Sequence, residues 1–324
     1  MPSFLYMRGY DCSLTACTPV DPSNAVTAIP TMGTALNSRV KGADVITVSY
    51  VNPTSGWSIG APGGSTLATS GSTGTITSIT LSPLTAQGEP PLANFTSGDL
   101  VMLADCSNAQ IFAASFTSPT LTPLTDTSNG FGPAAGVPSA QPPESVPKVF
   151  DVNRDFQTVT YYLKVVSVNN NDSAPFTGAL MRRVNGGIAN AVHGGSEDEL
   201  VRGVERMDFK YGVQDASGNI SFLTAAQVDS STNCPPAELN AITTTGCLWR
   251  GVTSVEVSLL MDGQAPLATL ADNDLFYSYS NDSNTGLLAP EDSSRTVKPT
   301  DQGFPDHLLR REFNVLVPVR NYNP

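Results

Sequence analysis

The sequence predicts a mainly β protein with little helix. Short runs in which apolar and polar residues alternate recur along the chain, and clusters of Gly, Asn, Asp, Ser and Pro separate them. Only 14% of the 324 residues are charged, against about 25% in typical soluble domains, and Ser, Thr, Asn and Gly fill the surface instead. This composition is typical of a secreted β protein, whose polar side chains hydrogen-bond in turns and on strands.

The first half of the chain contains four candidate strand regions. Residues 44–50 alternate apolar and polar side chains, as a half-buried strand does. Residues 65–81 are rich in Ser, Thr and Gly and indicate exposed strands joined by turns. The apolar run 100–104 follows a Gly-Asp turn signal, and 111–116 is its expected hairpin partner. Residues 117–148 carry many Pro, Gly, Ser and Thr, so we expect a long surface loop there, with a domain boundary as the alternative.

The second half of the chain begins with the strongest strand, residues 158–168, and 179–184 is expected to return beside it. Residues 199–211 are ambiguous, because their apolar positions fit both a helix and a strand. We expect a short turn there and then a strand from about Arg206. Further strands are predicted at 249–261 and 312–319.

The charge balance argues against nucleic-acid binding. The formal net charge is −12, and an acidic surface repels phosphate backbones. The chain contains no run of Lys or Arg, and its densest basic spots are Arg182-Arg183 and Arg310-Arg311. We expect these pairs to be ordinary ion-pair partners.

The search for catalytic and metal-binding motifs is negative, so we expect no enzyme activity, no cofactor and no metal. The two histidines, His193 and His307, leave little for histidine-based catalysis. The acidic run Glu197–Glu199 is expected to be a solvated charge cluster. Asp215–Asn219 and Asp272–Asp274 space their oxygen ligands like part of a calcium loop, but the rest of such a loop is missing.

The five cysteines predict disulfides rather than a metal site, because none stands in a C-x-x-C pair. Cys234 and Cys247 bracket a loop rich in Pro, Asn and Thr, and we expect them to pair. Closing a loop of that size stabilises a fold by roughly 3 kcal/mol in the chain-entropy model. Since five is odd, one thiol is left free or pairs with another chain.

The chain contains neither an apolar stretch of membrane-spanning length nor a signal peptide. Disulfides form in compartments that a protein reaches by export, so predicted disulfides are inconsistent with the lack of an export signal. We expect that a natural N-terminal segment precedes Met1.

Ordered blocks of the sequence resemble the PilW family of type IV pilus minor pilins. The most specific block is Glu199–Val213, which is similar to the family pattern E-L-V-x-G-V-x-x-M-x-x-x-Y-G-V. In another block, Leu180–Arg182, Met181 stands where the family carries a tyrosine. The remaining blocks are Phe4–Cys12, Lys41–Tyr50, Gly98–Phe112, Tyr161 with Leu180–Arg182, Trp249–Leu260 and Leu309–Asn321.

The resemblance implies a single pilin head, residues 1–324, built from two antiparallel sheets as in GspJ-type pseudopilins. The parts without family blocks, about 51–97, 117–155 and 263–303, are then loop insertions. In this family an N-terminal helix anchors the protein in the inner membrane and later packs in the filament core. This chain begins where that helix ends, so the resemblance implies that the helix is missing.

The resemblance also implies a function in the tip or initiation complex of the pilus, through binding to other minor pilins and to a tip adhesin. The protein would start in the inner membrane and periplasm and end on the extracellular pilus. The isolated head is expected to be a monomer. The alternative is a secreted adhesin-like domain that binds a ligand. Trp57 is the one exposed candidate for such a ligand site, and packing in the core is the other explanation for this residue. A secreted hydrolase is the least favoured class.

The family's cysteines imply a second disulfide, between Cys12 and Cys106. Cys17 is the rival partner of Cys106, and Cys12–Cys17 is the local alternative.

Overall fold

The computed structural model describes most of the chain, and the description below is limited to those residues. They are 7–23, 29–52, 54–69, 76–92, 95–104, 109–124, 147–169, 171–187, 194–215, 217–232, 246–264, 269–282 and 286–319.

The chain divides into two compact units. Unit 1 consists of Met1–Ser49, Thr158–Ile188 and Gly195–Pro324, and unit 2 consists of Tyr50–Gln157 and Ala189–Gly194. Unit 2 is therefore almost entirely one insertion into the sequence of unit 1.

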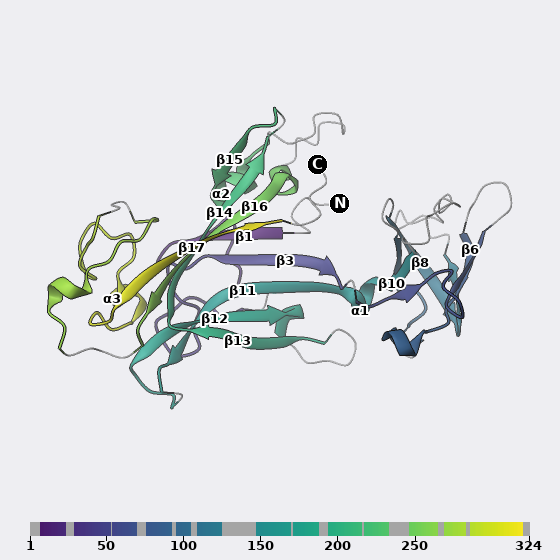
Figure 1. The fold of residues 1–324 in the computed structure, drawn as a ribbon, viewed down its shortest axis with the longest axis horizontal. Coiled ribbons are helices and arrows are strands. Elements are labelled where there is room, and N and C mark those ends of the chain that lie inside the picture. Colours follow the sequence, from purple (N-terminus) through teal and green to yellow (C-terminus); the bar gives the residue numbers. More distant parts are fainter. Residues whose placement is uncertain are drawn as a thin grey trace. The chain divides into compact units, whose positions relative to one another are not determined.

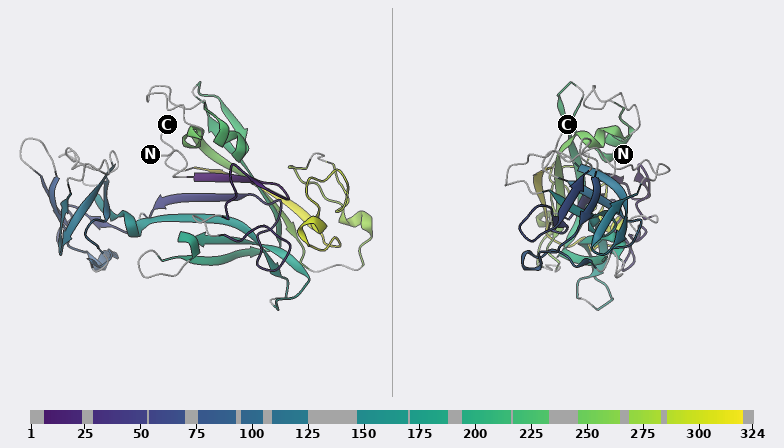
Figure 2. Two further views of the ribbon diagram at one scale, coloured as in Figure 1. Left: turned by 180° about the vertical axis from the view of Figure 1, so that it is seen from behind. Right: turned by 90° about the vertical axis from the view of Figure 1, so that its right-hand side faces the viewer.

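The first sheet of unit 1 has six strands, and all its ladders are antiparallel (Figures 1 and 2). The predicted strands at 44–50 and 158–168 correspond to its two central strands, of which the second is buried on both faces. In spatial order the strands are β13 (Ser196–Arg202), β12 (Phe176–Val184), β11 (Phe156–Ser167), β3 (Val45–Val51), β1 (Met7–Cys12) and β2 (Cys17–Thr18).

The second sheet of unit 1 has four antiparallel strands. In spatial order they are β15 (Ile220–Leu223), β14 (Val204–Gln214), β16 (Val252–Asp262) and β17 (Arg310–Pro318). The turn at Asp215 makes the predicted hairpin, because its carboxylate accepts hydrogen bonds from the backbone of Ser217 and Asn219. These backbone donors lower the pKa of Asp215.

One apolar layer joins the two sheets of unit 1. Ile46 and Leu163 of the six-stranded sheet belong to the same buried cluster as Met207, Phe209 and Val255 of the four-stranded sheet.

Helix is scarce in the described residues: the α-helices are α1 (Val152–Asp155), α2 (Ala225–Ser230) and α3 (Pro299–Gln302), and 3-10 turns include η2 (Thr85–Gln87), η4 (Asn185–Gly187), η5 (Cys247–Gly251) and η6 (Asp272–Leu275). No helix in this part of the chain has the length and apolar character to cross a membrane.

Unit 2 has a sheet and a core of its own. Trp57, Phe112 and Leu121 are fully buried in one hydrophobic cluster there. In spatial order the strands are β4 (Trp57–Ser58), β10 (Lys148–Asp151), β7 (Leu100–Ala104), β8 (Ala109–Thr117), β9 (Thr120–Pro123), β6 (Ile76–Thr80) and β5 (Thr66–Thr69).

The mainly β fold and the predicted β7–β8 and β11–β12 hairpins are confirmed. Three features differ from expectation. The described residues form three antiparallel sheets, the third belonging to unit 2, where two were expected. The region 51–97, expected as a loop insertion with exposed strands at 65–81, contributes β4, β5 and β6 to the sheet of unit 2. The region 199–211 is strand on both sides of Gly203, which adopts a φ of 86° that favours glycine. That the whole chain folds as one domain stays a prediction.

A buried ion pair connects β14 to the start of β17. Glu205 and Arg310 form two hydrogen bonds, of 2.6 and 2.9 Å, and the ends of both side chains are fully buried. Arg310 also donates to the carbonyls of Asp306 and Leu308, and Gln302 of α3 donates to the carbonyl of Glu205. The pair therefore fixes the chain that leads into β17.

We expect Glu205→Gln to lower the free energy of unfolding by about 3–5 kcal/mol, because it removes the carboxylate that is paired with the buried Arg310 charge. Glu199→Gln is the matched control. Glu199 pairs with Arg202 nearer the surface, so its loss should cost about 1 kcal/mol or less. Urea unfolding of both variants measures the difference, and equal costs would contradict the assignment.

Candidate functional site

An apolar groove of about 470 Å³ lies in unit 1 where the two sheets do not fully cover each other. One wall comes from β1, β3, β11 and β12, and the other comes from β14, β16 and the C-terminal end of β17. The Tyr161 hydroxyl is the one polar side-chain group in the lining. The lining residues are Met7, Ile46, Val48, Tyr161, Leu180, Met207, Phe209, Val255, Val257, Leu259, Val317, Pro318 and Val319.

The strand register explains how the groove becomes apolar. Val255 lies opposite Val317, Val257 opposite Val315 and Leu259 opposite Phe313. Because side chains two residues apart on a strand share a face, these pairs form apolar rows that run across the sheet.

The residues of these rows are buried or half-buried on β16 but exposed on β17. Phe313, Val315 and Val317 are 50%, 53% and 46% exposed. They extend the groove's apolar surface along β17. Such a continuous apolar surface is typical of an interaction site.

Gly9 brings the N-terminal strand close to the groove wall. A Cβ at this position would lie 2.0 Å from the Tyr211 hydroxyl oxygen, so only glycine lets β1 approach β14 this closely. This contact is the physical reason for glycine in the Arg8-Gly9-Tyr10 block. The Tyr211 ring in turn packs edge-on against Trp249, with 4.9 Å between ring centroids.

Asp44 ties the two sheets together beside this contact. Its carboxylate accepts hydrogen bonds from the backbone N–H of Cys12 at 2.8 Å and of Phe209 at 3.0 Å. Burial raises the pKa of Asp44 well above its usual range, and the negative charge of Asp208 adds to the rise. Burial also raises the pKa of Asp208, although Arg206 and the Tyr279 hydroxyl, which donates to Asp208, oppose that rise.

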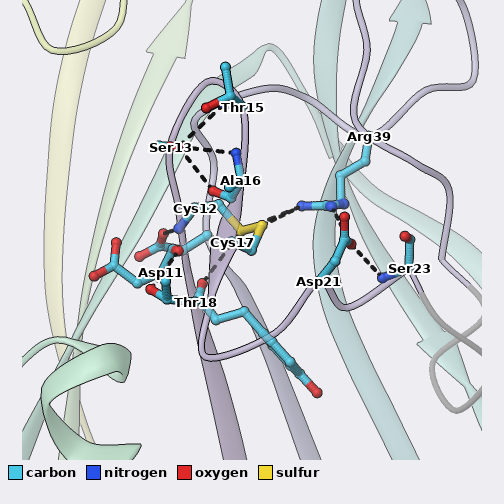
Figure 3. Close-up of a disulfide and its surroundings, with 12 residues drawn as sticks. Asp11, Cys12, Ser13, Thr15, Ala16, Cys17, Thr18, Asp21, Ser23 and Arg39 are labelled. Atoms are coloured by element: carbon cyan, nitrogen blue, oxygen red, sulfur yellow. Dashed lines mark hydrogen bonds and ion pairs between the residues drawn. A yellow bond between two sulfur atoms is a disulfide. The ribbon is translucent and has the colours of Figure 1, made fainter. Parts of the chain in front are cut away.

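A disulfide joins Cys12 to Cys17 at the end of β1 (Figure 3). The prediction that Cys12 pairs with Cys106 is therefore wrong, and the local alternative is correct. The reason is the turn between β1 and β2: the Ser13 hydroxyl accepts from the Ala16 N–H and donates to the Ala16 carbonyl, which places Cys17 opposite Cys12.

Arg39 is fully buried against this disulfide. Its Nη1 lies 3.2 Å from the Cys17 sulfur and 3.4 Å from the Cys12 sulfur, and its Nη2 forms an ion pair with Asp21 at 3.1 Å. Figure 3 shows the guanidinium between the sulfurs and the carboxylate. The sequence offered no signal for this contact, because the residues involved are up to 27 positions apart.

The structure does not show the disulfide partners of the other three cysteines among the described residues. Cys247 is buried and disulfide-bonded. Cys106 and Cys234 lie outside the described residues, so the pairing of Cys234 with Cys247 stays a prediction.

The described residues do not assemble a catalytic centre from the candidates that the sequence offered. The acidic run Glu197–Glu199 is used in ion pairs: Glu197 with Lys164 and Arg183, Asp198 with Arg182, and Glu199 with Arg202. No cluster of His, Cys, Asp and Glu in the described part of the chain has the arrangement of a metal site. His307 is exposed, and His193 lies outside the described residues.

Trp57, the candidate for an adhesin-like ligand site, is fully buried in unit 2. Its indole N–H donates to the carbonyl of Pro90, the ring packs against Phe95, and Arg154 lies over it at 4.7 Å. Its polar and aromatic surfaces are therefore used within the fold, as core packing requires.

Asp44 generates a prediction about pH. An aspartate in an unfolded chain has a pKa near 4, so folded protein binds a proton that unfolded protein has already released. Stability contributed by this group is complete at low pH and falls as pH rises from about 4 toward neutrality. We expect Asp44→Asn to flatten this dependence. Urea midpoints between pH 4 and 7 measure it; an unchanged slope in the variant would refute the shift.

The cysteines generate a second prediction. Non-reducing peptide mapping of oxidised protein should yield a Cys12–Cys17 peptide and a Cys234–Cys247 peptide. Free thiols at both Cys234 and Cys247 would disprove the second pairing.

The sequence matches the family model of PilW, type IV pilus-assembly protein W, over residues 160–321. The match covers half of the chain, including β12, β14, β16 and β17, so it contains the four-stranded wall of the groove. No curated protein sequence matches the chain, and no solved structure matches it. The chain thus belongs to the PilW family of type IV pilus-assembly proteins.

Proposed function

We propose that this protein is a minor pilin that promotes assembly of a type IV pilus by binding other minor pilins in the tip or initiation complex. The apolar groove of unit 1 carries the proposal. A structural subunit needs a stable fold and an exposed apolar surface for its neighbours, and the groove supplies that surface without a catalytic constellation in the described residues.

The chemistry of the groove suits the apolar side of a helix. Its lining is hydrophobic on both walls, and amphipathic helices bind in such grooves through side chains spaced three and four residues apart. Met7, the first residue of β1, lies in the lining. A helix preceding β1 would therefore enter at the groove itself. We propose that the membrane-anchoring helix implied by the family resemblance packs there.

The proposed location follows from this role. Before assembly the protein would be held in the inner membrane with its head in the periplasm, where disulfides form. After assembly it would be exposed on the extracellular pilus, with other minor pilins and a tip adhesin as partners. The isolated head would be a monomer, since a net charge of −12 opposes self-association. It would have no enzyme activity.

We expect deletion of the gene to reduce surface piliation, and restoration without the helix not to rescue it. Electron microscopy and shear preparations measure the number of pili. Normal piliation in a deletion strain that carries no second copy of the gene would count decisively against the proposal.

The groove itself can be tested in full-length protein with Val317→Asp, because Val317 belongs to the groove lining. This half-exposed position tolerates charge better than a core position, but a carboxylate beside the apolar rows should abolish rescue of piliation. Leu287→Asp is the control, because Leu287 is 69% exposed and lies outside the groove lining. Rescue by both variants would show that the groove is not used.

A further inference from the structure

β17 is an edge strand with an uninterrupted register. All nine of its residues pair with β16, from Arg310 opposite Asp262 to Pro318 opposite Ser254, and no bulge breaks the ladder. In the described part of the chain no strand pairs with its other side. Edge strands of this kind present unpaired backbone groups to solvent.

The hydrogen-bond pattern shows which backbone groups those are. Val319 donates to the carbonyl of Thr253, and the carbonyl of Leu309 accepts from Gly263. In an antiparallel ladder every second pair is bonded, so the odd-numbered residues of β17 point their N–H and C=O groups toward β16. The N–H groups of Glu312, Asn314 and Leu316 therefore point outward. Pro318, which has no N–H, also occupies an outward position, as proline does on edge strands.

The side chains beside this edge are apolar on the groove face and mixed on the other. Phe313, Val315 and Val317 lie on the groove face. The opposite face carries Glu312, Asn314 and Leu316, of which Leu316 is 57% exposed. Arg311 stands at the beginning of the strand, exposed and near the Phe313 ring.

The other sheet edges of unit 1 have the features that discourage strand pairing. β2 has two residues and β15 has four. β13 is longer, but it carries three consecutive acidic residues and a bulge opposite Leu180 and Met181. Short, charged or bulged edges avoid pairing with other chains, whereas β17 is long and regular and carries an apolar row on its groove face.

We propose that β17 accepts an extended segment of a different polypeptide, which adds to the four-stranded sheet as a fifth strand. This inference rests on the proposed function and names the kind of partner surface: a strand with apolar side chains at alternate positions and a carboxylate facing Arg311. Backbone groups at Glu312, Asn314 and Leu316 supply the ladder, and the alternate apolar residues cover Phe313 and Val315.

A second copy of this chain is the less suitable occupant. Two copies would each bring a net charge of −12, and their repulsion opposes association at low salt. A partner segment that is less acidic overall avoids this cost.

Hydrogen exchange with mass spectrometry tests the proposal on the head, with purified heads of the other minor pilins of the same organism as probes. On binding, the amides of Glu312, Asn314 and Leu316 should become protected. Asn314→Pro, which removes the central outward N–H without touching the bonds to β16, should weaken binding about tenfold or more. Asn314→Ala keeps the N–H and should weaken it by less than about threefold. Ile220→Pro, at the opposite edge of the same sheet, is the control and should leave binding unchanged.

The outcomes separate the two proposals. Binding that survives Asn314→Pro, with new protection confined to the groove strands, would overturn strand addition and leave the proposed function intact. Dimerisation through these amides, stronger at high salt, would identify a second copy as the occupant and overturn the inference. Failure of every probe to bind would overturn both. If Asn314→Pro does not fold, the protection of the three amides in the unmodified head decides the matter.

Discussion

The apolar contact between the two sheets of unit 1 determines most of what this protein can do. Each sheet has a hydrophobic face, and burying those faces against each other supplies the largest core in the described chain. The contact is incomplete near β17, where the groove opens and Phe313, Val315 and Val317 stay half exposed. The groove is the uncovered remainder of the same layer, so folding and partner binding use one continuous surface.

Two buried polar interactions, which we call polar ties, fix the positions of the strands that form this layer. Asp44 joins the end of β1 to β14 through two backbone N–H groups, and the Glu205–Arg310 pair fixes the start of β17 to β14. Buried polar groups are costly unless every bond is made, so neither tie tolerates a shifted strand. Their effect is to place the exposed part of β17 at one defined position beside the groove.

The groove and the β17 edge offer two different kinds of contact from adjacent surfaces. The groove presents side chains only and suits a helix, whereas the edge presents backbone groups and suits a strand. A subunit with both could bind a helix and an extended strand at the same time. Unit 2, by contrast, buries Trp57 and Phe112 in a core of its own.

The sequence by itself determined the β class, most strands and the family, because alternation and turn residues are local signals. Both strands that flank the open side of the groove, 249–261 and 312–319, were among those predicted. Tertiary structure alone decided three things. The register of β16 and β17 gathers apolar residues into rows, Gly9 allows β1 to reach Tyr211, and the turn at Ser13 pairs Cys12 with Cys17 instead of Cys106. The first two depend on residues that meet only after the chain has folded back on itself, and periodicity within one segment carries no information about which segment lies beside it. The third depends on the hydrogen bonds of one tight turn between Ser13 and Ala16, which periodicity does not report either.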